Sequence, residues 1–358
     1  MTQPRRRPAW WWRITALVLP LLVLSGCGDN PQSALEPAGE YARKIHGLWD
    51  LGFGIAVAVF VVVEGLLLLL LIRFRARPGN ELPKQVHGNT RLEIGWTILP
   101  ALLLAVLAVP TVATIFDLAD VPSGDDVLEI RVTGHQWWWE VDYLDNNAEV
   151  DFSTANEIHI PVGTTVAFDL ESFDVIHSFW VPRLAGKLDV VPGHTNRLAM
   201  KADEAGVYSG QCAEFCGLSH ANMRLRVVAD DPDDYEAWAA GQRRPAATPE
   251  SGLAARGHQL FAEKGCIGCH TLVGYEGAEA RVGPNLTHIQ SRSTFAGAIF
   301  ELTPANLKRW LADPPAMKPM QPEEIGPRSN PQRPIGMPNL GLSPDEIEAL
   351  VAYLETLE

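Results

Sequence analysis

Two long apolar segments in the first third of the chain constrain its fold more than any other feature. Residues 51–72 are apolar except for Glu64, and residues 94–116 form a second, mainly apolar run. Because a helix rises about 1.5 Å per residue, either run can cross the hydrocarbon core of a bilayer, which is about 30 Å thick. The sequence therefore predicts a multidomain membrane protein with a two-helix transmembrane hairpin within residues 40–117.

The charges beside these runs indicate how the hairpin is oriented. Basic residues from Arg73 to Arg91 lie between the two runs, whereas acidic residues follow the second run from Asp117 onward. The positive-inside rule places the connecting loop in the cytoplasm. We therefore expect everything after residue 117 on the outer, periplasmic side of the membrane.

The first 27 residues have the features of an export signal. Three arginines precede an apolar stretch from Ile14 to Leu24, and the segment ends in Leu-Ser-Gly-Cys at Cys27. A basic start, a short apolar core and small residues at the end are typical of a signal peptide. The ending resembles the bacterial lipobox, so we expect a lipoprotein-type signal over residues 1–27 and a location in the bacterial inner membrane. A chance run of small residues with an inert Cys27 is the alternative.

The exported part divides into two regions of different character. Residues 125–230 contain short alternating stretches separated by Gly, Pro and Asn, which predicts an antiparallel β-sandwich. Residues 231–250 indicate a short helix or turn followed by a linker. Residues 251–358 contain short helices, and the last of them has a capping box that begins at Ser343. This third region is expected to form an all-α domain.

The overall charge and the number of cysteines limit the possible partners and the possible roles of the thiols. The net charge is −14, which argues against a nucleic-acid partner. The chain has five cysteines, an odd number, so a fully paired disulfide framework cannot account for all of them. Each cysteine therefore needs its own explanation.

A first chemical cluster lies at the end of the predicted sandwich. Cys212, Cys216, His220 and Met223 fall within twelve residues, and His177 upstream can add a second imidazole. Thiolates, imidazoles and a thioether form a soft ligand set that favours copper, with enough donors for two ions. The alternatives are a Cys212–Cys216 disulfide, a structural zinc site, and a core role for His177 alone.

The order HSFWVP, PG and GQCAEFCGLSHANM resembles the binuclear CuA domain of subunit II of haem–copper cytochrome c oxidases. The resemblance covers roughly residues 40–230 and implies a cupredoxin-like sandwich. It implies copper ligation by the side chains of His177, Cys212, Cys216, His220 and Met223 and by the backbone carbonyl of Glu214. It also implies a magnesium site, shared with subunit I, that the Glu214 side chain faces.

Two further segments resemble functional parts of the same family. Residues 134–139 resemble its aromatic segment, in which an exposed tryptophan receives electrons, and Trp137 aligns best with that residue. Residues 92–100 resemble the start of the second helix, where a glutamate, here Glu93, lies at the cytoplasmic mouth of a proton path in subunit I. Taken alone, Trp137 could instead be a core residue and Glu93 an interfacial charge.

A second chemical cluster is the C-x-x-C-H sequence of Cys266, Cys269 and His270, which is the attachment pattern of a covalently bound c-type haem. A redox dithiol is the alternative, but no thioredoxin-like βαβ pattern surrounds these residues. Residues 251–358 resemble a class I cytochrome c, which implies a methionine as the sixth iron ligand. Met337 fits best, and Met317 and Met320 are rivals because residues 319–334 look like an insertion.

Together the two clusters predict an electron relay from haem c to CuA and then to subunit I, where O2 is reduced and protons are translocated. The resemblance implies subunits I and III as partners and cytochrome c or a bc1-type complex as the donor. A CuA subunit of a nitric or nitrous oxide reductase, or a stand-alone electron carrier, remains an alternative.

Overall fold

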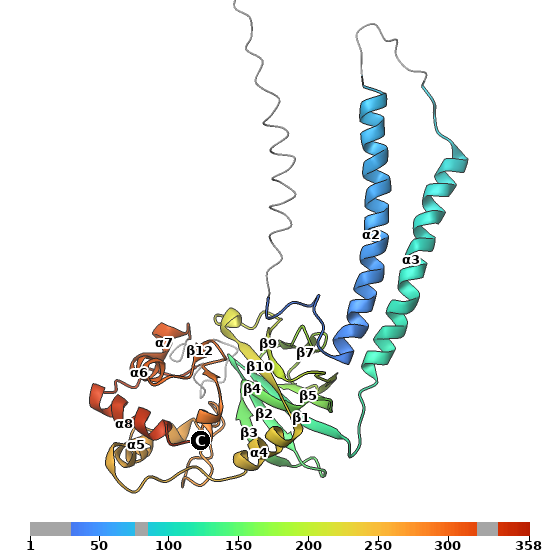
Figure 1. Ribbon diagram of the computed structural model, residues 1–358. Helices are drawn as coiled ribbons and strands as arrows, with labels where there is room; N and C mark the ends of the chain where they lie inside the picture. The colour runs from blue at the N-terminus through green and yellow to red at the C-terminus, as the bar shows by residue number, and fades with distance from the viewer. Residues whose placement is uncertain (1–29, 76–84, 321–335) are drawn as a thin grey trace, which may run out of the picture.

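The computed structural model describes residues 30–75, 85–320 and 336–358. A membrane hairpin, a β-sandwich and a helical domain follow one another along the chain (Figure 1). The predicted signal peptide and Cys27 lie outside the described residues.

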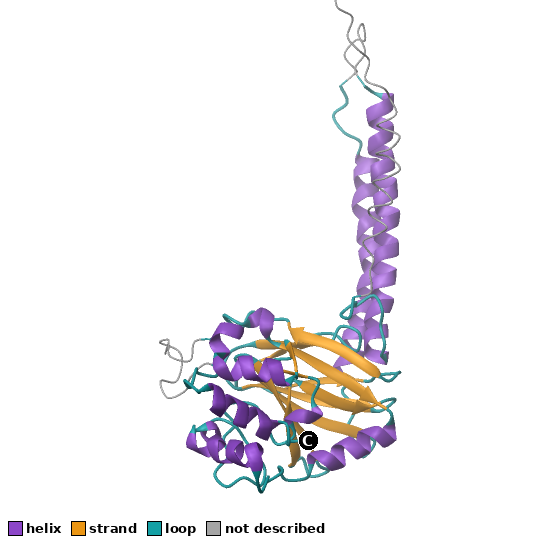
Figure 2. Ribbon diagram, turned by 60° about the vertical axis from the view of Figure 1, so that its left-hand side comes forward, coloured by secondary structure: helices purple, strands orange, loops and turns teal. Residues whose placement is uncertain are grey.

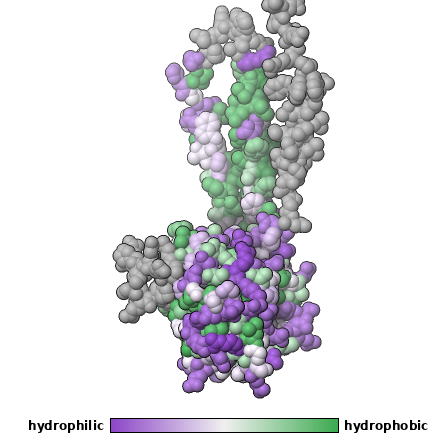
Figure 3. Space-filling view, turned by 90° about the vertical axis from the view of Figure 1, so that its left-hand side faces the viewer, coloured by the Kyte–Doolittle hydropathy of each residue, from purple (hydrophilic) through white to green (hydrophobic). Residues whose placement is uncertain are grey.

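Helices α2 (Glu40–Arg73) and α3 (Thr90–Ala119) form the hairpin and lie side by side (Figure 1). Within the described ranges these two helices are long and apolar enough to cross a membrane. Their sides are hydrophobic, whereas the rest of the visible surface is mainly hydrophilic (Figure 3). Both helices extend beyond the predicted spans, and the N-terminal end of α2 does so because it meets the sandwich. Tyr41 and Ala42 are buried there, and the Ala42 N–H donates to the carbonyl of Leu184 at 3.1 Å.

Two five-stranded sheets form the sandwich, and the structure confirms this predicted architecture. The first sheet contains, in spatial order, β3 (Val150–Ala155), β2 (Trp138–Leu144), β1 (Val127–His135), β5 (Thr165–Ser172) and β8 (Asn196–Met200). The second contains β4 (Glu157–Pro161), β10 (Arg224–Asp230), β9 (Gly206–Cys212), β6 (His177–Trp180) and β7 (Leu188–Val190). Most strand pairs are antiparallel, as predicted, but β1 pairs with β5, and β10 with β4, in parallel. Each of these pairs joins strands that a hairpin does not connect.

The predicted linker is ordered by contacts with both neighbouring domains. Helix α4 (Pro232–Gln242) confirms the predicted short helix. Beyond it, the Arg243 side chain pairs with Asp151 of the sandwich at 2.8 Å, and the Ala246 N–H donates to the carbonyl of Val273 at 2.7 Å. The connection therefore follows a defined path between the domains.

The C-terminal domain is built from α5 (Gly252–Glu263), α6 (Pro304–Ala312), α7 (Pro314–Met317) and α8 (Pro344–Leu354). It also contains a two-stranded hairpin of β11 (Thr294–Phe295) and β12 (Phe300–Glu301) and two short 3-10 helices, η2 (Cys266–Gly268) and η3 (Ile289–Ser291). Helices α5 and α8 cross at Gly257, where an added Cβ would lie 2.0 Å from the Ala349 carbonyl oxygen. The predicted capping box at Ser343 is present at the start of α8.

The C-terminal domain packs directly against the sandwich (Figures 1 and 2). Glu157 of the sandwich is only 3% exposed, and its carboxylate accepts from both the N–H and the hydroxyl of Ser293. Arg281 of the C-terminal domain pairs with Glu140 and Asp142 of the sandwich. A buried charged group is costly unless it is paired or hydrogen-bonded, so these contacts indicate one defined docking position.

Candidate metal centres

Two strand ends and one loop bring the first cluster together. His177 begins β6, Cys212 ends β9, and the loop that leads through η1 (His220–Asn222) to β10 carries the other donors. The Cys212 and Cys216 Sγ atoms are 3.7 Å apart, and Cys212 Sγ lies 3.9 Å from His177 Nδ1. Cys216 Sγ lies 3.6 Å from His220 Nδ1.

The remaining two predicted donors lie in the same cluster. Met223 Sδ is 3.8 Å from Cys216 Sγ, and the Glu214 carbonyl oxygen is 3.2 Å from Cys212 Sγ. A disulfide has an S–S distance near 2.05 Å, and all four cysteines among the described residues are free. The structure therefore brings all six predicted donors together and rejects the disulfide alternative.

The chemistry of this pocket fits a copper pair. His177 and Met223 are fully buried, and Cys212 and Cys216 are nearly so. His177 Nε2 contacts the Asp174 carboxylate at 2.9 Å, which leaves Nδ1 directed at Cys212. Metal-binding histidines are commonly oriented in this way by a carboxylate. A buried set of sulfur and nitrogen donors that includes a thioether suits copper better than zinc.

The electrostatics of the cluster favour the ligating form of a thiol. The hydrogen bond between the two sulfurs lowers the pKa of Cys212, although burial opposes this effect. Burial also disfavours a charged His177, but its contacts with Asp174 and Cys212 raise its pKa overall. The thiolate is the form that binds metals, so the lowered pKa of Cys212 favours metal binding.

The sequence-based expectation of an exposed Trp137 is wrong. Its side chain is 4% exposed, and its ring lies against Gly217 of the loop that carries the copper donors. The indole N–H donates to the Cys216 carbonyl at 3.0 Å, and the Trp137 carbonyl accepts from the Lys318 ammonium group at 2.7 Å. Trp137 thus contacts a predicted copper ligand on one side and the C-terminal domain on the other. Its role in receiving electrons stays a prediction.

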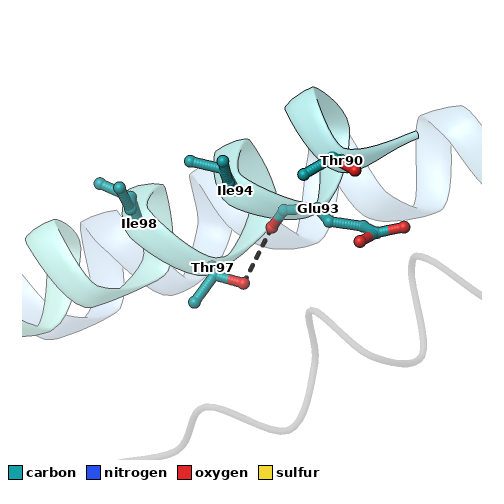
Figure 4. A pocket seen from close by; sticks show the side chains of 5 residues that line it. All are labelled: Thr90, Glu93, Ile94, Thr97 and Ile98. Atoms are coloured by element: carbon teal, nitrogen blue, oxygen red, sulfur yellow. Dashed lines mark hydrogen bonds between the residues drawn. The ribbon is translucent and has the colours of Figure 1, made fainter. Parts of the chain in front are cut away.

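Glu93 and Glu214 both lie on the surface. Glu93 is in the first turn of α3, at the end of the hairpin away from the sandwich, and Thr97 donates to its backbone carbonyl at 2.9 Å (Figure 4). Glu214 lies beside the exposed Phe215, and its carboxylate accepts from the Phe215 N–H. Both carboxylates are accessible to a partner subunit, and their predicted roles remain untested.

The second cluster lies on the short helix η2 and the residues that follow it. Cys266 and Cys269 are half-buried free thiols. His270 Nδ1 contacts the Pro284 carbonyl at 2.8 Å, which leaves Nε2 for a metal. Burial lowers the pKa of His270, so the imidazole is neutral, as an iron ligand must be. An added Cβ on Gly283 would lie 2.7 Å from the His270 ring, so the glycine leaves room for the imidazole. These donors fit a covalently held haem.

The surroundings of the methionines distinguish between the candidate sixth ligands. Met337 packs against the core of the C-terminal domain together with Cys266, and its sulfur accepts from the Trp310 indole N–H at 3.1 Å. Met320 instead packs against the core of the sandwich. Met337 therefore packs with Cys266 in the core of the C-terminal domain, whereas Met320 lies between the sandwich core and Gly336, next to Met337.

We expect Met337→Ala to remove the weak far-red absorption band of a sulfur–iron bond and to lower the haem reduction potential, because a methionine ligand raises that potential. Met320→Ala is the matched control and should leave the band intact. Optical spectra and a redox titration of the two variants measure both effects. If the band disappears in Met320→Ala and persists in Met337→Ala, the assignment is reversed.

Sequence reasoning missed the buried cations that join the two domains. Lys318 is 3% exposed, and Arg292 is 8% exposed and donates to Thr154 of the sandwich at 3.1 Å. Nothing in the local sequence PPAMKPM distinguishes a buried lysine from an exposed one. Only the packing of the two domains identifies these residues.

Curated relatives match this chain over most of its length. The cytochrome c oxidase subunit 2 of Alkalihalophilus pseudofirmus is 40% identical, with 97% of this chain and 98% of the relative covered. The corresponding Bacillus subtilis protein is 37% identical over 86% of this chain and 90% of the relative. Among solved structures, the periplasmic domain of cytochrome oxidase subunit II from Bradyrhizobium japonicum aligns with 30% identity and a TM-score of 0.32, covering 34% of this chain and 96% of that one.

Three family models match successive parts of the chain. Residues 32–114 match "Cytochrome C oxidase subunit II, transmembrane domain", residues 148–230 match "Cytochrome C oxidase subunit II, periplasmic domain", and residues 254–358 match "Cytochrome c". The fold and the two clusters define a membrane-anchored oxidase subunit with a cupredoxin-like sandwich and a cytochrome c domain. The chain belongs to the cytochrome c oxidase subunit 2 family and is a subunit of a haem–copper oxidase.

Membership of this family carries several general properties. It implies copper in the sandwich, haem in the C-terminal domain, subunit I as a partner, and a membrane anchor with a periplasmic domain. It also supports a role at the point where electrons enter the oxidase.

Proposed function

We propose that this chain relays electrons from haem c to the CuA centre of a respiratory cytochrome c oxidase, and from there to subunit I, where O2 is reduced to water with proton translocation. One observation carries the proposal. The haem-binding domain is packed on the sandwich at Trp137, and the Trp137 indole donates to the Cys216 carbonyl within the cluster of copper donors. This arrangement supports direct transfer between the two sites.

The residues have the following roles in the proposal. Copper would be held by the side chains of His177, Cys212, Cys216, His220 and Met223 and the carbonyl of Glu214. Cys266 and Cys269 would hold the haem covalently, with His270 and Met337 as iron ligands. Each bound group supplies one-electron chemistry. The protein buries His177, Cys212, Cys216 and Met223, and it orients the imidazoles of His177 and His270 through Asp174 and the Pro284 carbonyl.

Other parts of the chain serve the complex rather than the relay. Glu214 would face a magnesium site at the boundary with subunit I, and Glu93 would lie at the mouth of the proton path in that subunit. Residues 1–27 would be a lipoprotein-type signal, with Cys27 acylated at the outer face of the bacterial inner membrane. Residues 40–117, 125–230, 231–250 and 251–358 would be the hairpin, the CuA domain, the connection and the cytochrome domain.

Subunit III and an external donor complete the proposed assembly. The donor would be cytochrome c or a bc1-type complex that delivers electrons to the haem. We expect the complex that copurifies with the tagged full-length chain to take up O2 when reduced cytochrome c is supplied. Oxygen electrode measurements test this expectation. Consumption of nitric or nitrous oxide without O2 uptake would assign the chain to a reductase of those gases, and consumption of none of the three would leave a stand-alone carrier.

A further inference from the structure

One buried ammonium group bridges the two domains beside the proposed copper site. Lys318 Nζ donates to the carbonyl of Trp137 in the sandwich at 2.7 Å and to the carbonyl of Ala296 in the cytochrome domain at 2.8 Å. The side chain follows α7 and is 3% exposed. Lys318 therefore fixes the backbone of one domain to the backbone of the other.

The Ala296 side of this bridge is the tight turn between β11 and β12. Ala296, Gly297 and Ala298 all have positive φ angles, of 57°, 83° and 55°. A Cβ on Gly297 would lie 2.6 Å from Lys318 Nζ and 2.8 Å from the Asn222 carbonyl oxygen, so only glycine allows this close approach. The Gly297 carbonyl also accepts from the Arg224 N–H at 2.9 Å, directly after Met223. The turn therefore packs closely against the loop that carries the copper donors.

The other side of the turn leads to the haem-binding residues. Phe295 packs edge-on against Trp310, with ring centroids 5.7 Å apart, and the Trp310 indole donates to Met337 Sδ at 3.1 Å. On the sandwich side, Trp137 donates to the Cys216 carbonyl at 3.0 Å. A continuous series of contacts thus joins the candidate haem ligand Met337 to the candidate copper ligand Cys216, and Lys318 completes it at the domain boundary.

Placing a lysine at this position is energetically unfavourable in itself. Burial lowers the pKa of Lys318 to about 7, and its two acceptors are neutral carbonyls rather than a carboxylate. A buried cation without a charged partner costs free energy that an apolar side chain would not. The other docking contacts, such as those of Arg281 and Ser293, already join the domains. This cost indicates a role for Lys318 beyond attachment.

We propose that Lys318 is a positioning residue that holds the Ala296–Gly297 turn against Trp137 and so sets the rate of electron passage from the cytochrome domain into the copper site. The inference rests on the proposed function. In this passage one electron leaves the ferrous haem, which becomes ferric, and the oxidised copper pair takes up that electron. No bond is made or broken and no proton is transferred.

The test uses the full-length chain, loaded with copper and haem, and the variant Lys318→Met. Methionine keeps a long side chain but cannot donate to either carbonyl. After photoreduction of the haem by a ruthenium sensitiser, its reoxidation by the copper pair should slow several-fold, because the rate of electron transfer falls steeply as the contacts between donor and acceptor lengthen. Lys308→Met, which removes an exposed ammonium group on α6, is the matched control and should transfer electrons at the unaltered rate.

Two further measurements separate positioning from other effects. Redox titrations should give unchanged potentials for both centres in Lys318→Met, so that driving force does not explain the slower transfer. Hydrogen exchange should accelerate at the Arg224 amide, which the turn protects, and not at the Ser293 amide, which Glu157 protects. Transfer at the original rate, or a shift in potential that accounts for the slower rate, would overturn the proposal.

If Lys318→Met separates the two domains, a second variant tests the same proposal. Gly297→Ala keeps the ammonium group but forces the turn away from Asn222. Slow transfer with a protected Ser293 amide would support the proposal, and transfer at the original rate would refute it. The measurement does not depend on oxygen uptake. If the wild-type chain transfers electrons internally but its complex consumes no O2, the proposed function fails while the role of Lys318 is still decided.

Discussion

Cys212→Ser is expected to abolish the mixed-valence electron paramagnetic resonance signal of the copper pair and to lower the ratio of bound copper to haem. Cys212 lies at the centre of the cluster, with its sulfur near His177, Cys216 and the Glu214 carbonyl. Serine is nearly isosteric, but its hydroxyl is a hard, neutral donor that cannot bridge two copper ions.

The haem provides an internal standard for this experiment. The haem absorption spectrum and its covalent attachment should be unchanged, since residues 266–270 lie in a different domain with a separate core. Copper content by elemental analysis and the spin resonance spectrum of the purified chain measure the effect. An intact two-copper signal in Cys212→Ser would show that the ligand assignment is wrong.

The second large effect is expected when Cys266 and Cys269 are both replaced by serine. A hydroxyl cannot form the thioether bonds that attach a c-type haem, so no haem should remain on the chain after denaturation. Noncovalent haem is expected to bind weakly, because His270 and Met337 would then hold it alone. Haem staining of a denaturing gel measures the loss directly.

This double variant and Cys212→Ser are reciprocal controls. The copper signal should persist when the haem thiols are removed, and the haem should persist when the copper thiol is removed. Covalent haem in the double variant would refute the attachment site. Loss of both centres in either variant would mean that the two domains depend on each other for folding, which their separate cores argue against.

Local sequence signals predicted much of this molecule. The apolar runs identified the two membrane helices because spanning a bilayer demands length and hydrophobicity. The donors between Cys212 and Met223 lie in one loop, so their spacing alone predicts that they meet, and the structure brings them together with His177. The capping box at Ser343 likewise marked the start of α8, because capping is a contact within one helical turn.

Features that depend on distant residues could not be predicted in this way. The parallel pairing of β1 with β5 joins strands whose order in the sheet no local pattern specifies. The extension of α2 to Glu40 reflects packing of Tyr41 and Ala42 on the sandwich. The burial of Lys318 depends on domain docking, because its partner Trp137 is 181 positions away in the chain. The exposed tryptophan expected from the resemblance is buried, since its indole packs on the Cys216–Gly217 loop of the same sandwich.

The position of the cytochrome domain over Trp137 has a consequence for how such an oxidase can evolve. A soluble donor that approached the sandwich could not bind the Trp137 carbonyl or the Arg224 N–H. These groups are already hydrogen-bonded to Lys318 and Gly297. Choice of the donor is then a property of the outer surface of the C-terminal domain. Substitutions on that surface could match the enzyme to a new supplier while the copper donors and the membrane hairpin stay unchanged. In the proposed relay, the docked domain would therefore separate the surface that meets the donor from the copper donors beneath it.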